Sequence, residues 1–290
     1  MPELASCKQT ALVTWMSLTG LNMDDDKQKV KDFWNKASCG EELYLADLSQ
    51  AGFDAQRERR YELEPYIREF ARFEETHGQA VLEIGVGLGA DHEGFARAGA
   101  ILHGIDLTER AVARTRQRLD WFGLRSALQV ADAEQLPFPA ESFDVVYSWG
   151  VLHHSPNTVK AISEVRRVLR PGGRASIMIY NYWSLVGLML WTRYALLRGR
   201  PFTGLGQIYS RFLESPGTKA YTPSEARALF EGWSSCDIRT VLTHGDLLIG
   251  EAGQRHQGQL LSLARRVWPR WLLRRALPSA GLFMLIDARR

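Results

Sequence analysis

The stretch VLEIGVGLGAD, residues 81–91, decides the fold. A short apolar run of β-formers stops at three glycines on alternate positions, Gly85, Gly87 and Gly89, and a helix-like segment begins near Ala90. This order predicts a strand, a tight turn and a helix. Glycine permits a positive φ and carries no Cβ that would keep a ligand away, and a helix N-terminus presents free N–H groups. The turn is therefore a candidate site for a carboxylate or a phosphate.

The glycine spacing leaves two classes of ligand open. It satisfies Gly-x-Gly-x-x-Gly/Ala through Gly85, Gly87 and Ala90, which allows a dinucleotide such as a nicotinamide cofactor. Glu83, two residues before the first glycine, favours a positively charged ligand instead, and S-adenosylmethionine carries a sulfonium and an ammonium. Asp106 ends a second predicted strand about twenty residues beyond the turn, where a carboxylate can accept both hydroxyls of a ribose. The sequence therefore indicates an adenosine-containing ligand.

A set of motifs resembles the class I S-adenosylmethionine-dependent methyltransferases. The motifs are Glu-x-Gly-x-Gly-x-Gly at residues 83–89, Asp106, Ala131-Asp132-Ala133 followed by Leu136-Pro137-Phe138, Phe143-Asp144-Val145-Val146, and Leu169-Arg170-Pro171-Gly172-Gly173. Each motif alone is weak, but all of them in order at workable spacing are specific. The resemblance is close over about residues 32–182, and the core is similar to the ubiquinone and menaquinone methylases.

The alternation of strand and helix predicts an α/β fold with a doubly wound, mostly parallel sheet. We expect parallel strands at 81–84, 101–105, 127–130, 144–149 and 175–180, and helices at 91–98, 109–121 and 159–169 between them. The resemblance implies a seven-stranded sheet with an antiparallel last strand, its final strands being 238–242 and 282–287. It also implies an N-terminal helical lid in a cap at 23–78, ahead of a methyltransferase domain at 79–290. A helical run through 61–73 is expected in that cap.

Two helical insertions are expected in the domain, at about 183–220 and 243–280. The first opens with the apolar stretch WSLVGLMLWTRYALL, which suits a core helix, a substrate lid or a membrane-surface segment. The second contains LLSLARRVWPRWLLRRAL, with apolar Leu260, Leu261, Ala264 and Trp268 on one side and arginines on the other. That pattern favours an amphipathic helix packed on its own domain, with peripheral membrane contact through 258–277 as the alternative.

Composition narrows the classes of function. The chain has 290 residues, is 45% hydrophobic and carries a net charge of +3, which suits a large core and gives no field that argues for a nucleic acid partner. Cys7, Cys39 and Cys236 are odd in number and far apart, which favours a cytoplasmic protein without a disulfide framework. We expect no metal site, and we expect residues 1–22 to be disordered or to precede the true start. The oligomeric state stays open.

The resemblance implies a set of cofactor contacts. Gly85, Gly87 and Gly89 pass close to the methionine portion with help from Glu83, Asp106 holds the ribose, and Asp132 and Ala133 border the adenine. Leu107 and Ser148 complete the expected S-adenosylmethionine site.

The stretch SWGVLHHS, residues 148–155, follows the fourth strand and faces the transfer site in this architecture. Histidine has a pKa suited to take a proton near neutrality, so His153 and His154 are the catalytic candidates, with a structural role equally open. The expected substrate pocket comprises Trp34, Tyr44, Tyr180, Tyr182, Tyr221 and His244.

We expect methyl transfer to a small, lipophilic, hydroxylated molecule. O-methylation is favoured, and C-methylation of a quinol or polyketide-like ring comes next. A nicotinamide-dependent oxidoreductase and a non-catalytic, cofactor-binding scaffold at a membrane surface are the alternatives.

Overall fold

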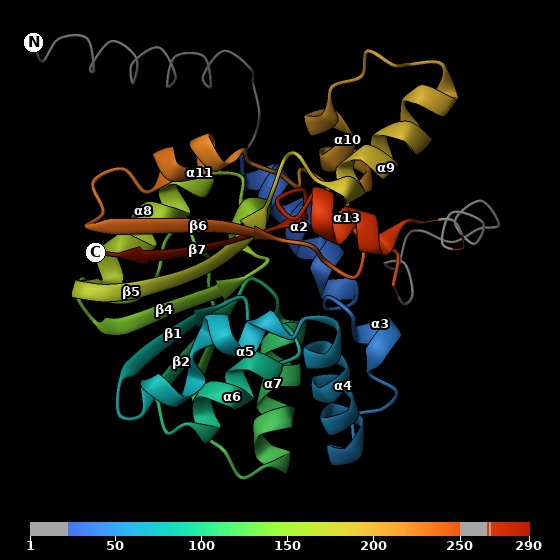
Figure 1. The fold of residues 1–290 in the computed structure, drawn as a ribbon. Helices are drawn as coiled ribbons and strands as arrows, with labels where there is room; N and C mark the ends of the chain where they lie inside the picture. Colours follow the sequence, from blue (N-terminus) through green and yellow to red (C-terminus); the bar gives the residue numbers. More distant parts are fainter. Residues whose placement is uncertain (1–22, 250–265, 267) are drawn as a thin grey trace, which may run out of the picture.

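The computed structural model describes residues 23–249, 266 and 268–290. A seven-stranded sheet with the order β3-β2-β1-β4-β5-β7-β6 forms its centre (Figure 1). The strands are β1 (Ala80–Ile84), β2 (Ile101–Asp106), β3 (Ala127–Val130), β4 (Phe143–Trp149), β5 (Leu169–Tyr180), β6 (Ser235–Val241) and β7 (Phe283–Arg289). β7 lies antiparallel between β5 and β6, and the strands from β3 to β5 pair in parallel. The predicted α/β fold with an antiparallel last strand is confirmed.

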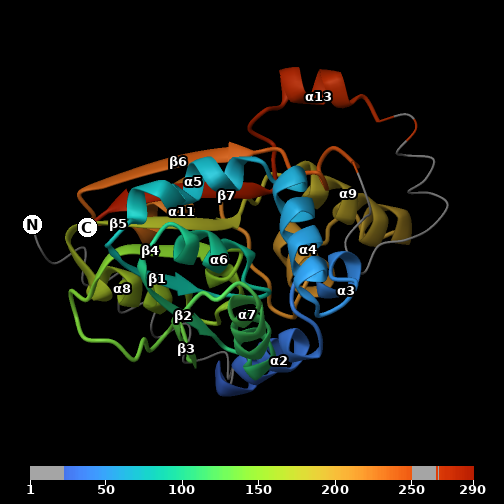
Figure 2. The ribbon, with the colours of Figure 1, turned by 90° about the horizontal axis from the view of Figure 1, so that it is seen from below.

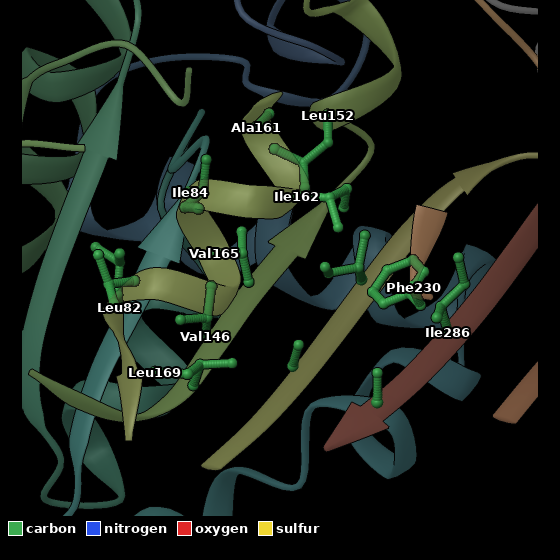
Figure 3. Packing of buried hydrophobic residues seen from close by; sticks show 14 of the residues in the cluster. Leu82, Ile84, Val146, Leu152, Ala161, Ile162, Val165, Leu169, Phe230 and Ile286 are labelled. Carbon is green, nitrogen blue, oxygen red and sulfur yellow. The ribbon is translucent and has the colours of Figure 1, made fainter. Parts of the chain in front are cut away.

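Helices cover both faces of this sheet (Figure 1). One face carries α5 (Tyr66–Ala71), α6 (Ala90–Arg97) and α7 (Glu109–Trp121), and the other carries α8 (Thr158–Val168) and α11 (Pro223–Leu229). Successive strand residues point to opposite faces. Leu82 and Val146 pack with Ile162 of α8 (Figure 3), whereas Val81 and Val145 pack on the side of α5 and α6. Burial on both faces explains why these strands are apolar almost throughout.

Several elements differ in their bounds from the sequence expectation, and the reason is clear for β5 and for the run through 61–73. β5 begins at Leu169 rather than 175, because Leu169 pairs with Phe143 before the register shifts and Arg174 pairs with Val145. The expected helical run through 61–73 is two helices, because Pro65 lacks an N–H and disfavours helix at the residue before it. β6 also begins earlier than expected and ends one residue before 242.

An N-terminal cap lies at the carboxyl edge of the parallel strands (Figure 2). Its helices are α2 (Met23–Lys36), α3 (Glu41–Tyr44) and α4 (Gln50–Leu63), followed by α5 and the 3₁₀ turn η1 (Phe73–Thr76). The buried Glu41 carboxylate accepts two hydrogen bonds from Arg110 of α7, at 2.8 and 2.9 Å, and a third from Arg114 at 3.0 Å. Such charge-assisted bonds fasten the cap to the sheet domain.

The chain between β5 and β7 adds further helices. They are α9 (Leu185–Tyr194), η3 (Leu196–Arg198), α10 (Leu205–Phe212) and α13 (Arg270–Ala276). Gly187 of α9 lets the Tyr209 ring of α10 approach, and the Tyr209 hydroxyl donates to the Tyr182 carbonyl at 2.9 Å. Leu260, Leu261 and Ala264, and residues 1–22, lie outside the described residues. No helix in the described ranges is long and apolar enough to cross a membrane.

Candidate functional site

A cavity of about 410 Å³ lies between the carboxyl ends of the parallel strands and the N-terminal cap. Its floor comes from the glycine turn after β1, from Asp106 at the end of β2, and from the segments 131–133 and 149–151 that follow β3 and β4. Side chains of α2 and α4 also line it. Open α/β sheets bind ligands at this edge.

The three glycines of the turn all have positive φ, but they serve different purposes. The φ angles are 84° at Gly85, 53° at Gly87 and 76° at Gly89. A Cβ on Gly85 would lie 2.1 Å from Val151, and one on Gly89 would lie 2.9 Å from Thr115. A Cβ on Gly87 would meet nothing within 4 Å. Gly85 and Gly89 therefore allow close packing, whereas Gly87 leaves its backbone open to the cavity.

The carboxylate of Asp106 is held in a fixed orientation at the cavity wall. One oxygen accepts hydrogen bonds from the backbone N–H of Thr108 at 3.0 Å and from its hydroxyl at 2.8 Å. The other accepts from the Gly87 N–H at 3.2 Å. Burial raises the pKa of Asp106, and these hydrogen bonds oppose the rise. An oriented acceptor of this kind suits the hydroxyls of a ribose.

Glu83 lines the same cavity but is engaged by a buried chain of hydrogen bonds. Its Oε2 lies 2.8 Å from Nδ1 of His92, and Nε2 of His92 lies 2.8 Å from the Ser126 hydroxyl, which donates to the Leu102 carbonyl at 2.9 Å. Because the Ser126 hydroxyl uses its proton to donate to the Leu102 carbonyl, it accepts a hydrogen bond from Nε2 of His92. Nδ1 of His92 then carries no proton and accepts a hydrogen bond from the Glu83 carboxyl group. Burial raises the pKa of Glu83 and lowers the pKa of His92 to about 3, which agrees with a protonated Glu83 beside a neutral His92.

The cavity wall also holds a histidine and a carboxylate. Nδ1 of His154 lies 2.8 Å from the Ser215 hydroxyl and 3.1 Å from that of Thr218. Nε2 of His154 lies 3.3 Å from Oε2 of Glu214, and that oxygen accepts a hydrogen bond from Tyr180 at 2.7 Å. The hydroxyls fix the imidazole, so that Nε2 and Glu214 sit together at the cavity wall.

His153 is placed differently from its neighbour. It is fully buried behind the cavity wall, with its ring 3.9 Å from the ring of Tyr180, and it is not among the lining residues. Neither of its ring nitrogens has a hydrogen-bond partner within the described structure. Burial holds its pKa well below the usual value for histidine, so the imidazole is neutral.

The other candidate residues divide into two groups. The residues that line the cavity are Trp34, Tyr44, Leu107, Asp132, Ala133, Tyr180 and His244. Ser148, Tyr182 and Tyr221 do not line it. Ser148 is buried and donates to the Ile84 carbonyl at 3.0 Å. Tyr182 and Tyr221 join their backbones through a hydrogen bond of 2.9 Å between the Tyr182 N–H and the Tyr221 carbonyl.

Sequence reasoning missed a second polar group in the cavity. Arg60 donates to both oxygens of Asp91, at 3.0 and 2.6 Å, and Tyr147 donates to Asp91 at 2.9 Å. Glu64 lies 3.4 Å from Arg60, and burial raises its pKa to about 7. The four-residue spacing of Arg60 and Glu64 on one helix face was a usable signal. Glu214, in the loop after α10, carries no local pattern that would have pointed to the site.

Part of this chain is similar in sequence to known proteins. Residues 82–177 match the model of the methyltransferase domain family. The chain is 38% identical over 103 residues to 27-O-demethylrifamycin SV methyltransferase of Amycolatopsis mediterranei, covering 34% of this chain and 38% of that protein. It is 38% identical over 106 residues to the ubiquinone biosynthesis O-methyltransferase of Azoarcus sp., covering 36% of this chain and 45% of that protein. The matches therefore span less than half of either relative.

A solved structure shows the same fold. Phosphoethanolamine N-methyltransferase 2 of Haemonchus contortus, in complex with phosphomonomethylethanolamine and S-adenosylhomocysteine, superposes with a TM-score of 0.56 at 18% identity. The superposition covers 90% of this chain and 60% of that one. Of the two ligand classes that the glycine turn left open, the match to a methyltransferase domain favours S-adenosylmethionine over a nicotinamide.

Proposed function

We propose that this chain, whose residues 82–177 match a methyltransferase domain, transfers a methyl group from S-adenosylmethionine to a small, lipophilic, hydroxylated acceptor. One observation carries the proposal: a single cavity joins Gly87 and Asp106 to His154 and Glu214. The two relatives described above are named for O-methylation or for an O-demethylated substrate, which supports an oxygen acceptor. C-methylation of a quinol or polyketide-like ring is the next choice.

The near half of the cavity fits the cofactor. Asp106 presents an oriented carboxylate to the ribose, segment 131–133 borders the adenine, and the open side of Gly87 admits the methionine portion. When bound, S-adenosylmethionine supplies an electrophilic methyl group on its sulfonium. The cap holds Trp34 over the cavity and limits the entry of water, which competes with the acceptor.

The far half of the cavity fits an apolar acceptor with one polar end. Trp149, Met178 and Phe283 supply apolar walls, and His154 with Glu214 supplies the polar end. Methyl transfer needs the acceptor oxygen in line with the methyl group, so placement of the hydroxyl is the main task of these residues. The imidazole and carboxylate also favour loss of the hydroxyl proton. His153 supports them from behind.

The test is turnover with labelled S-adenosylmethionine and a panel of hydroxylated aromatic acceptors of rising hydrophobicity. We expect labelled methyl ether from at least one member, with no product from Asp106→Ala. Asp237→Ala, on the exposed side of β6, is the matched control and should keep full turnover. Products labelled on carbon, or only with amine acceptors, would contradict the oxygen preference.

The separated cysteines support the cytoplasm as the place of this reaction.

A contact with a membrane surface is proposed as well, because α13 is exposed. Trp271 is 74% exposed and Leu272 is 52% exposed, beside the basic Arg274 and Arg275. Apolar and cationic side chains together suit anionic lipid, and a lipophilic acceptor is concentrated there. Co-sedimentation with anionic and neutral vesicles tests the contact. Failure of the chain to pellet with anionic vesicles would remove it.

A further inference from the structure

The two histidines after β4 and Glu214 form a cluster that methyl transfer alone does not demand. One ligand atom each of His153, His154 and Glu214 lies within 4.8 Å of the other two. We propose that these three side chains bind a zinc ion, and that the acceptor hydroxyl completes its coordination. The inference rests on the proposed function and deepens it by stating how the acceptor oxygen is held.

Buried ring nitrogens without partners are the first observation. His153 is fully buried and His154 is 5% exposed. No described residue forms a hydrogen bond with either nitrogen of His153 or with Nε2 of His154, which has the Glu214 carboxylate 3.3 Å away. Buried polar groups in native proteins are nearly always bonded, so each exception calls for a missing partner. A metal ion at the centre of the cluster provides that partner for both rings.

The surrounding hydrogen bonds are the second observation. A histidine that binds a metal usually bonds its other ring nitrogen to a protein group, which fixes the orientation of the ring. Ser215 and Thr218 hold Nδ1 of His154 in this way, at 2.8 and 3.1 Å. The carboxylate is oriented too, because Tyr180 donates to Glu214 at 2.7 Å.

The spacing of two of the ligands fits tetrahedral zinc. Ligands at about 2.0–2.1 Å from a tetrahedral zinc ion lie about 3.4 Å from each other. Nε2 of His154 and Oε2 of Glu214 are 3.3 Å apart. Two histidines and a carboxylate with one open position are typical of catalytic zinc. His154 and Glu214 line the cavity and His153 lies behind them, so the open position faces the acceptor.

The chemistry balances without an oxidant or reductant. Coordination to zinc lowers the pKa of the acceptor hydroxyl, and its proton passes to water. The oxygen then forms a bond to the methyl carbon as the carbon–sulfur bond breaks, and the electron pair of that bond stays on sulfur. The products are the methyl ether, S-adenosylhomocysteine and a proton. Zinc keeps its charge and its three protein ligands throughout.

The experiment measures zinc binding by the full chain after removal of metals with a chelator. Calorimetric titration with Zn²⁺, and visible absorption with Co²⁺ as a spectroscopic probe, should both report one ion per chain. Ser215→Ala should weaken the affinity about 10–100-fold. Glu214→Gln and His154→Gln should weaken it by at least that factor. Glu64→Gln, a change in another buried carboxylate of the same cavity, should bind zinc like the wild type.

The outcomes separate this inference from the proposed function. Folded wild-type chain that binds no zinc overturns the inference, as does Glu214→Gln that binds zinc with wild-type affinity. Metal-free chain that binds S-adenosylhomocysteine and methylates at the full rate also overturns it, and leaves the proposed function standing. Because Glu214 is partly exposed, its substitution tests the site even where a change at buried His153 prevents folding.

Discussion

The Nζ atom of Lys27 lies 2.6 Å from Oδ2 of Asp132 and joins the first helix of the cap to the segment after β3 that lines the cavity. The same ammonium lies 3.0 Å from Glu134, whose other oxygen accepts from the Asn157 N–H at 2.8 Å. One lysine therefore connects the cap with the segments after β3 and β4. We therefore expect the position of the cap and the shape of the cavity wall near Asp132 to depend on each other through Lys27.

Lys27→Met should loosen the cap. We expect S-adenosylhomocysteine to bind several-fold more weakly and unfolding to cost about 1 kcal/mol less, because two partly buried ion pairs are lost. Calorimetry and urea denaturation measure the two effects. Lys29→Met, which removes exposed pairs on the same helix, should leave both quantities unchanged. Equal behaviour of the two variants would contradict the coupling.

Gly87→Ala and Gly89→Ala should separate binding from packing. Both residues have positive φ, so each change costs about 1–2 kcal/mol of stability through backbone strain. At Gly89 the new Cβ also lies 2.9 Å from Thr115, so this variant should be the less stable. At Gly87 the Cβ enters the cofactor side of the cavity. Gly87→Ala should therefore stay folded and lose S-adenosylhomocysteine binding, and retention of full affinity would contradict the assignment.

Glu64 should make stability depend on pH. Burial raises its pKa from 4.5 to about 7, so the folded state binds the proton more tightly than the unfolded state. The contribution of protonated Glu64 to the free energy of unfolding is therefore full at pH 4.5 and below, and it is lost as the pH rises to 7. The shift corresponds to roughly 3 kcal/mol. In urea denaturation, the wild type should lose more stability than Glu64→Gln between pH 5 and 8, and parallel curves would contradict this.

His154→Gln should lower kcat about 10²–10⁴-fold, because it removes a group that acts on the acceptor hydroxyl. S-adenosylhomocysteine affinity should change little, since the proposed cofactor contacts are made by Asp106 and Gly87 instead. Single-turnover rates with saturating cofactor measure the chemical step. A loss of cofactor binding that matches the loss of rate would instead assign His154 to the cofactor side.

Local sequence patterns predicted those parts of the fold that depend mainly on neighbouring residues. The glycine turn, Asp106 and the parallel strands follow from residue type and periodicity, which explains why their places agree with expectation. The first residue of β5 could not be predicted from local sequence, because it depends on the pairing of Leu169 with Phe143 of another strand. Nothing in the sequence distinguished His153 from His154. In the turn η2 (Leu152–His154), His154 lines the cavity whereas His153 does not.

The polar groups that arrive from distant segments were out of reach of sequence reasoning. Glu214 meets His154 only because the loop after α10 folds back over the cavity, and Arg60 meets Asp91 only because the cap docks on α6. Aromatic residues were candidates by type alone, and Tyr182 and Tyr221, which are partly buried and joined by a backbone hydrogen bond, do not line the cavity. Tertiary packing decides such placements.

Calorimetric titration of the full chain with S-adenosylhomocysteine, with Asp106→Ala beside it, tests the central claim most directly. We expect one binding site per wild-type chain, lost in the variant while its melting temperature stays close to that of the wild type. Folded wild-type chain that takes up no S-adenosylhomocysteine would contradict the assignment of the cavity to this cofactor.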